Sequence, residues 1–107
     1  MNNIVRSGVV LAIVASLACA VGFAQSSGEA VYKTRCMNCH GPTGLANLGI
    51  GKIMKVKPVT DPLVRNMSRA EMIAATEKGM GKMQGYKGDL TDEQIRAVVV
   101  YFRTFIK

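Results

Sequence analysis

The pattern of apolar and polar positions divides the chain into an apolar leader and a helical remainder. Residues 9–23 carry almost no polar side chains. Further along, apolar residues recur at helical spacing, and no strand-like alternation of any length is present. The clearest apolar stripe has the spacing i, i+3, i+4, i+7 and i+11: Ile95, Val98, Val99, Phe102 and Ile106. The pattern predicts an all-α protein in which this stripe serves core packing.

Capping signals place the predicted helices. Three segments pair Ser or Thr with Glu or Gln three residues later, which is the capping-box pattern: Ser26 with Glu29, Ser68 with Glu71, and Thr91 with Gln94. The first helix should reach about Cys39, and the second should stop at Gly79. Asp61 before Pro62 predicts one additional short helix. Glycine-rich stretches between the helices are expected to form loops, with a turn near Ile53 in the first: residues 41–60 and 79–89.

The apolar leader has the order of a secretory signal. Arg6 precedes the apolar run, and small residues at positions 22 and 24 precede Gln25. We therefore expect cleavage after Ala24, which divides the chain into a signal peptide, residues 1–24, and one domain, residues 25–107. Two alternatives stay open: the leader is retained as an anchor, or Cys19 carries a lipid.

Cleavage changes what the cysteine count means. Removal of 24 of the 107 residues leaves 83. Chains of this size usually need a disulfide, a metal or a cofactor to stabilise the fold in addition to their hydrophobic core. Only Cys36 and Cys39 then remain, so there is no second cysteine pair for a disulfide framework. We therefore expect a bound cofactor to provide this stabilisation.

The segment from Cys36 to His40 reads C-x-x-C-H, which is the attachment motif of a c-type haem. On one helical turn, Cys36 and Cys39 can present two thiols to the haem vinyl groups, and His40 can present its imidazole to the iron. The imidazole must be neutral, and a backbone carbonyl in residues 41–60 is expected to orient its other ring nitrogen. The motif predicts one covalently bound haem c.

Two other readings of the cysteine pair are less favourable. A thioredoxin-like redox pair belongs in a βαβ context, whereas this sequence shows no strands. A structural zinc site usually takes four ligands, and only Cys36, Cys39 and His40 are obvious candidates.

The second axial ligand must come from elsewhere, because the chain has a single histidine. Six methionines remain after cleavage: Met37, Met54, Met67, Met72, Met80 and Met83. Core packing accounts for Met67 and Met72, and gap filling accounts for Met54. Met80 and Met83 lie in the glycine-rich loop, where the backbone is free to bring a thioether to the iron. The residues by themselves leave these two open.

These motifs resemble the class I bacterial monohaem cytochromes c, the small His/Met-ligated periplasmic type, over residues 27–107. The resemblance rests on the following features: Gly28, Tyr32 and Cys36 at spacing four and four, the Cys36–His40 motif with Gly41, residues 81–86, residues 90–95 and residues 98–103. It implies a cytochrome c fold for residues 25–107, with three main helices and a short helix around one haem. It also implies that Gly28 and Tyr32 meet Val98 and Tyr101 where the first and last helices cross.

The resemblance also bears on the iron ligand and the function. The axial methionine of that family stands in a G-x-M-P-like loop. Met83 matches its position, while Gln84 replaces the usual proline. The resemblance thus implies Met83 as the sixth ligand, with Met80 as the alternative. His/Met ligation raises the reduction potential and leaves no iron position open for a substrate. We therefore expect a periplasmic single-electron carrier rather than an enzyme.

Charge indicates the kind of partner. The formal net charge is +7, or +6 once Arg6 is removed, and two haem propionates would offset part of it. A basic carrier suits an acidic redox partner protein, in a membrane complex or soluble, or transient contact with an anionic membrane surface. A basic surface that serves only solubility is the alternative. The basic residues are scattered, not clustered with aromatic residues, which argues against nucleic acid. We expect a monomer with lysines around the haem edge: Lys52, Lys55, Lys57, Lys78, Lys82 and Lys87.

Other functions with the same haem stay open. A labile sixth position would suit gas sensing or peroxide handling, and the chain could instead be a haem subunit of an exported oxidoreductase complex. Arg65, Tyr86 or a loop lysine would hold the haem propionates if any side chain does.

Overall fold

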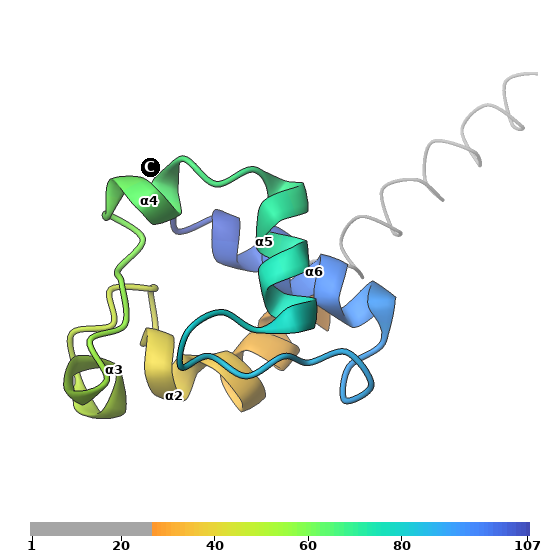
Figure 1. The fold of residues 1–107 in the computed structure, drawn as a ribbon, viewed down its shortest axis with the longest axis horizontal. Coiled ribbons are helices and arrows are strands. Elements are labelled where there is room, and N and C mark those ends of the chain that lie inside the picture. The colour runs from red at the N-terminus through yellow and green to blue at the C-terminus, as the bar shows by residue number, and fades with distance from the viewer. Residues whose placement is uncertain (1–26) are drawn as a thin grey trace, which may run out of the picture.

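The computed structural model of the protein describes residues 27–107. These residues form helices joined by loops, as Figure 1 shows. After a helical segment at residues 27–31, the elements are η1 (Tyr32–Cys36), α2 (Met37–His40), α3 (Gly49–Ile53), α4 (Pro62–Arg65), α5 (Arg69–Lys78) and α6 (Asp92–Arg103). Within the described range there is no strand, only isolated bridges, which confirms the all-α prediction. The predicted signal peptide, Cys19 and Ser26 lie outside the described residues.

The predicted helix starts within the described residues are confirmed. Ser68 and Thr91 each accept a hydrogen bond from the backbone of the residue three positions on, and Glu71 and Gln94 complete the two capping boxes. Asp61 caps α4 by accepting from the backbone N–H of Leu63. These bonds satisfy backbone donors that a helix start would otherwise leave unpaired. Side chains close in sequence therefore determine where these helices begin.

The first helix differs from the prediction in its middle. The chain is helical from residue 27 to His40, but residues 32–36 form a π-helical turn. Its widened geometry appears where the backbone N–H of Met37 donates to the carbonyl of Tyr32. Such turns are rare and occur frequently at functional sites. A second difference is α3, which replaces the expected turn near Ile53 and gives the fold two short helices instead of one.

The first helix packs against α6 at a glycine. A Cβ atom on Gly28 would lie 2.2 Å from the carbonyl oxygen of Ala97 and 3.1 Å from the Cβ of Tyr101. One turn on, the buried Tyr32 ring lies 5.4 Å from the Tyr101 ring, centroid to centroid. The crossing is therefore as expected, with Ala97 as an additional close neighbour of Gly28. The core around it consists of Val31, Tyr32, Leu90, Ile95 and Val98.

The close packing at Gly28 predicts that a larger residue at this position destabilises the fold. Gly28→Ala should lower the free energy of unfolding by about 1–3 kcal/mol, because the added methyl group would meet backbone that cannot turn away. Alanine's better helix propensity offsets at most about 1 kcal/mol of this loss. Ala30→Val, on the exposed side of the same helix, should lower stability by no more than about 0.7 kcal/mol, which is the helix-propensity cost of a β-branched residue. Chemical denaturation measures both variants, and a neutral Gly28→Ala would contradict the packing described here.

Within residues 27–107, no helix combines the length and apolar character needed to cross a membrane.

Candidate haem site

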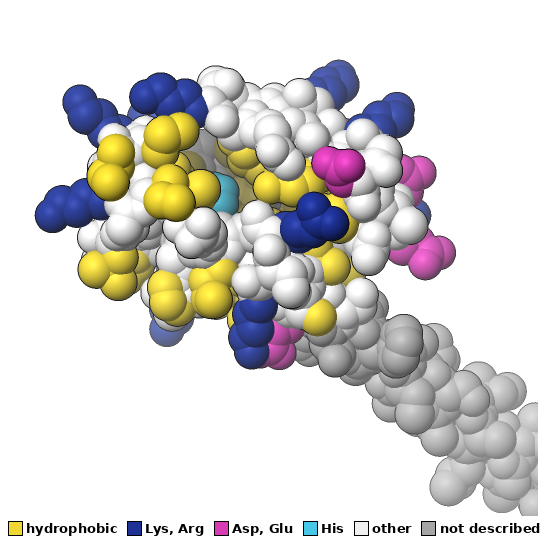
Figure 2. All heavy atoms as spheres, turned by 90° about the horizontal axis from the view of Figure 1, so that it is seen from below, with side chains coloured by type: hydrophobic (Ala, Val, Ile, Leu, Met, Phe, Trp, Pro, Cys, Tyr) yellow, Lys and Arg dark blue, Asp and Glu magenta, His cyan; other side chains and the backbone are white. Residues whose placement is uncertain are grey.

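A cavity of about 370 Å³ opens between the first helix, α5, α6 and two loops. This volume lies within the usual range for small-molecule sites, roughly 300–1,000 Å³. Figure 2 shows the hollow, with the histidine side chain visible inside it. The lining is mostly apolar and includes five methionines: Met54, Met67, Met72, Met80 and Met83. Such a cavity suits a large, mostly apolar group.

The C-x-x-C-H motif lies at the wall of this cavity. Cys36 and His40 line it, while Cys39, on the same stretch of helix, is not among the lining residues. Both cysteines are half-buried free thiols. Burial raises the pKa of the Cys36 thiol to about 11, and burial also lowers the pKa of His40. His40 is therefore neutral near pH 7, which is the form that can bind a metal.

The surroundings of His40 differ from the prediction. Its Nδ1 atom is buried and has no hydrogen-bond partner among the described residues, so the expected bond to a carbonyl in residues 41–60 is not present. The loop does contact the histidine's backbone, since Ala46 N–H donates to the His40 carbonyl over 3.0 Å. Across the cavity wall, the His40 and Phe102 rings meet edge to face with centroids 5.4 Å apart.

Three contacts from outside the motif hold it in place. The Tyr32 hydroxyl donates to the carbonyl of Gly41, directly after the motif, over 2.5 Å. The Tyr86 hydroxyl donates to the carbonyl of Arg35, directly before it, over 3.1 Å. On a third side, α3 lies so close that a Cβ on Gly51 would be 2.0 Å from the Cys39 carbonyl oxygen. The motif is thus fixed from both ends and from the side.

The contact at Gly51 gives a second prediction. Gly51→Ala should push α3 away from the motif and reduce the yield of haem-loaded protein, because a methyl group cannot fit against the Cys39 carbonyl. It should also lower the free energy of unfolding by about 1–3 kcal/mol. The absorbance ratio of haem to protein measures the first effect. Lys52→Ala, at the next and exposed position of α3, is the control and should leave the ratio unchanged. An unchanged ratio for Gly51→Ala as well would show that α3 does not brace the motif.

Met80 and Met83 form a hydrogen-bonded pair across a tight turn. The Met80 N–H donates to the Met83 carbonyl over 3.0 Å, and the Met83 N–H donates to the Met80 carbonyl over 2.9 Å. Directly paired residues of this kind place their side chains on the same face, and both methionines line the cavity. They differ in burial, since Met80 is 60% exposed whereas Met83 is partly buried. The more enclosed thioether is therefore that of Met83.

The base of this loop is packed tightly. A Cβ on Gly79 would lie 2.6 Å from the Met83 carbonyl oxygen, and one on Gly85 would lie 2.7 Å from the Glu77 carbonyl oxygen. Beyond the turn, Tyr86 N–H donates to the Thr76 carbonyl over 2.9 Å, which ties the loop to α5. The glycines predicted to give freedom to this loop also allow it to close on itself.

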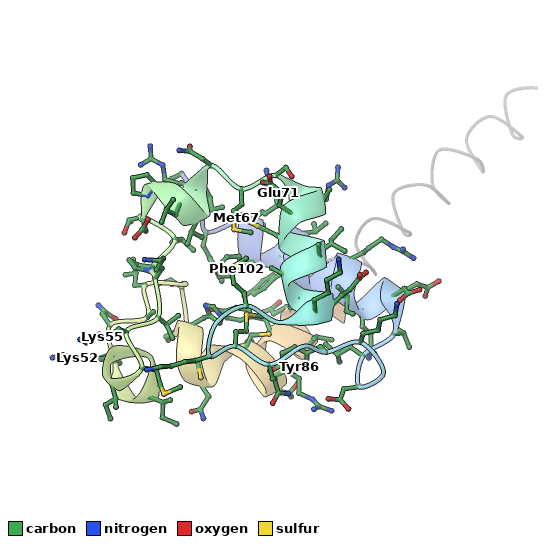
Figure 3. All side chains as sticks on the ribbon, viewed as in Figure 1. Lys52, Lys55, Met67, Glu71, Tyr86 and Phe102 are labelled. Carbon is green, nitrogen blue, oxygen red and sulfur yellow. The ribbon has the colours of Figure 1, made fainter. Side chains whose placement is uncertain are left out.

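Several lining residues were not predicted as part of the site. Met54, Met67 and Met72, explained by packing, all face the cavity. The apolar stripe of α6 has the same double role, since Val98, Val99 and Phe102 line the cavity, so its assignment to core packing alone is wrong. Figure 3 shows Met67 and Phe102 in the middle of the molecule. Helical periodicity identifies an inward face, but it cannot distinguish a protein core from a cofactor.

The candidate propionate partners are also revised. Neither Arg65 nor Tyr86 lines the cavity, and the Tyr86 hydroxyl is engaged with Arg35. Three lysines do line it: Lys55, Lys57 and Lys82. Thr76, buried on α5, was not predicted at all. It lines the cavity while its hydroxyl donates to the Met72 carbonyl.

Comparison with known protein families gives one match. Residues 23–102 match the family described as cytochrome c oxidase, cbb3-type, subunit III. The chain belongs to this family. It is therefore a c-type cytochrome with a covalently bound c-type haem, and its function is haem-based electron transfer, which confirms the predicted cofactor and the general function. The narrower class I resemblance stays a prediction. A comparison with curated proteins found no match.

The residues present in this c-type cytochrome fit its haem. The attachment motif lies at the wall of an apolar cavity, and the neutral imidazole of His40 lines that cavity. Thioethers occur on the loop at residues 80–83 of the same cavity. Among the described residues, no group of three or more His, Cys, Asp or Glu side chains is arranged to hold a metal ion, so the zinc reading finds no support there.

Proposed function

We propose that the chain is an exported single-electron carrier with one haem. Cys36 and Cys39 would form the thioether bonds, and His40 and Met83 would bind the iron, with Met80 as the alternative to Met83. The main support for this proposal is that residues of the motif and of the paired methionine loop line the same apolar cavity. When bound, the haem supplies a one-electron Fe(II)/Fe(III) couple.

The chain's own side chains tune this couple. Apolar residues exclude water from the cavity, and a thioether ligand favours the reduced iron, so both raise the reduction potential. If His40 and Met83 both bind the iron, they would leave no coordination position for a substrate. These features support a carrier without enzymatic activity of its own.

One pair of measurements tests this proposal. The intact mass of the secreted protein should equal residues 25–107 plus one haem, and a further lipid mass or an uncleaved leader would show itself directly. The ferric spectrum should show the weak band at the red end that sulfur ligation produces. Rapid CO binding to the reduced protein would contradict the closed site and favour gas sensing or peroxide handling.

A second candidate comes from the family description. It names an oxidase subunit, so the chain could act as the haem subunit of an exported oxidoreductase complex. Affinity purification from membranes distinguishes the two. A carrier should elute as a monomer, whereas a subunit should elute together with a stable set of other chains.

Exposed lysines that line the cavity suggest that electrostatic attraction guides association with a redox partner. Lys55, Lys57 and Lys82 line the cavity, and all three are exposed. Electron transfer to an acidic partner protein should therefore slow by a factor on the order of ten or more between low and high ionic strength. Stopped-flow kinetics measures this dependence. Lys82→Glu should weaken it, whereas Arg69→Glu, on α5 and outside the cavity, should change it little. Rates that do not fall with salt would contradict steering by lysines.

A further inference from the structure

The short helix α3 and the loop before it expose more aliphatic surface than their size would suggest. Four large apolar side chains are 42–79% exposed there: Leu45, Leu48, Ile50 and Ile53. Ile50 and Ile53 are three positions apart on α3, so they lie on the same side of the helix. None of these side chains belongs to the core cluster or to the partly buried residues packed against it. Packing within residues 27–107 therefore does not explain them.

The charge around these residues has one sign. Between Glu29 and Asp61 the sequence contains no acidic residue, but it carries five basic ones: Lys33, Arg35, Lys52, Lys55 and Lys57. Figure 3 shows Lys52 and Lys55 at the outer edge of the molecule beside α3. In Figure 2, hydrophobic side chains gather on this side with basic ones around them, while most acidic side chains lie at the opposite end.

We propose that this surface binds a bilayer that contains anionic phospholipids. The surface, here named the α3 face, consists of Leu45, Leu48, Ile50, Lys52, Ile53, Lys55 and Lys57. Its exposed aliphatic side chains would enter the headgroup region, and its lysines would pair with lipid phosphates. Membrane surfaces are bound by segments of this kind, in which Leu-type side chains are flanked by Lys.

The composition favours a lipid surface over a protein partner. Protein interfaces are enriched in aromatic residues and Arg and depleted in Lys, and Leu and Val are under-represented at their energetic centres. The α3 face has no aromatic residue and three lysines. The complete absence of acids from residues 30–60 also disfavours a second copy of the chain, because two identical basic faces would repel each other.

The α3 face also adjoins the cavity. Lys55 and Lys57 belong to both, and Met54, the residue after α3, lines the cavity. Membrane binding would therefore bring the haem edge close to the lipid surface, where membrane complexes present their redox centres. This use of the α3 face rests on the proposed function, whereas the binding itself requires only the described surface.

Vesicle flotation with the secreted holoprotein tests the proposal. The protein should float with phosphatidylcholine vesicles that contain phosphatidylglycerol, but not with phosphatidylcholine alone. Neutralising three lysines by Lys52→Gln, Lys55→Gln and Lys57→Gln should weaken binding by roughly a hundredfold, at about fivefold for each lysine. The charge-matched control replaces three exposed cations elsewhere, Arg69→Gln, Arg96→Gln and Lys107→Gln, and should retain most of the binding.

A second pair of variants tests the aliphatic contribution. Leu48→Ser combined with Ile53→Ser should reduce binding at least tenfold and remove its residual strength at high salt. Leu63→Ser is the matched control, because Leu63 on α4 is 67% exposed, close to the 68% of Leu48, but lies away from α3. All of these residues are exposed, so the variants should fold, and an unchanged haem spectrum checks that they do.

Three outcomes would overturn the proposal. Equal binding to both vesicle types would show an attachment that does not depend on anionic lipid. Absence of vesicle binding, with a dimer that the Leu48 and Ile53 changes dissociate, would show an interface between copies. Absence of vesicle binding, with a redox protein whose affinity depends on the same residues, would show protein docking. None of these results depends on the axial ligands, so failure here leaves the spectral test of the proposed function intact.

Discussion

Met83→Ala should convert the ferric iron from low spin to high spin and lower its reduction potential. With Met83 as the proposed sixth ligand, removal of its thioether would take away the group that favours reduced iron and open a coordination position to water. The potential should fall by on the order of 0.1 V or more, a part of the roughly 0.8 V over which axial ligands set haem potentials. The band at the red end of the ferric spectrum should disappear. Absorption spectroscopy, electron paramagnetic resonance and a redox titration measure the three changes.

Met80→Ala is the matched control for this change. Met80 lies in the same turn and faces the same cavity, but it is 60% exposed. Its removal should leave the iron low spin. If Met80→Ala produces the high-spin iron and Met83→Ala does not, the ligand assignment is reversed. If only the double variant becomes high spin, either thioether can serve, and neither is the sole ligand.

Cys36→Ser should leave the haem attached by at most one thioether and sharply reduce the amount of holoprotein. Cys36 lines the cavity and would supply one of the two thioether sulfurs, which a serine hydroxyl cannot replace. Haem lost on denaturation and acid extraction, together with the intact mass, measures the change. Asn38→Ala, at an exposed position inside the same motif, should leave attachment unaffected. Haem retention equal to that of the wild type in Cys36→Ser would count against a covalent bond at this residue.

The predictions that succeeded rest on local interactions. The starts of α4, α5 and α6 depend on side chains that bond to backbone two or three residues away, so sequence spacing is sufficient to locate them. The end of α5 at Gly79 follows the same logic, since its φ of 82° is unfavourable for residues with a side chain.

Only the part of the site whose residues are adjacent in the sequence was predictable. Cys36, Cys39 and His40 are adjacent in the chain, and their spacing indicates one cofactor before any fold is known. The lining from Met54, Met67, Phe102 and Thr76 was not predictable in this way, because it comes from four separate segments. Each of those residues has an ordinary packing explanation within its own element, and only the meeting of the elements shows the cavity.

The sequence by itself determined the helix starts and the haem attachment motif, and it predicts a methionine as the second ligand. Those properties follow from neighbours in the chain and from the single histidine. Tertiary structure decided the rest: the π-helical turn before the motif, the burial of His40, the pairing of Met80 with Met83 and the exposure of the α3 face. These depend on contacts between residues far apart in the chain, such as Tyr86 with Arg35 and Gly51 with Cys39, and no local pattern encodes such contacts.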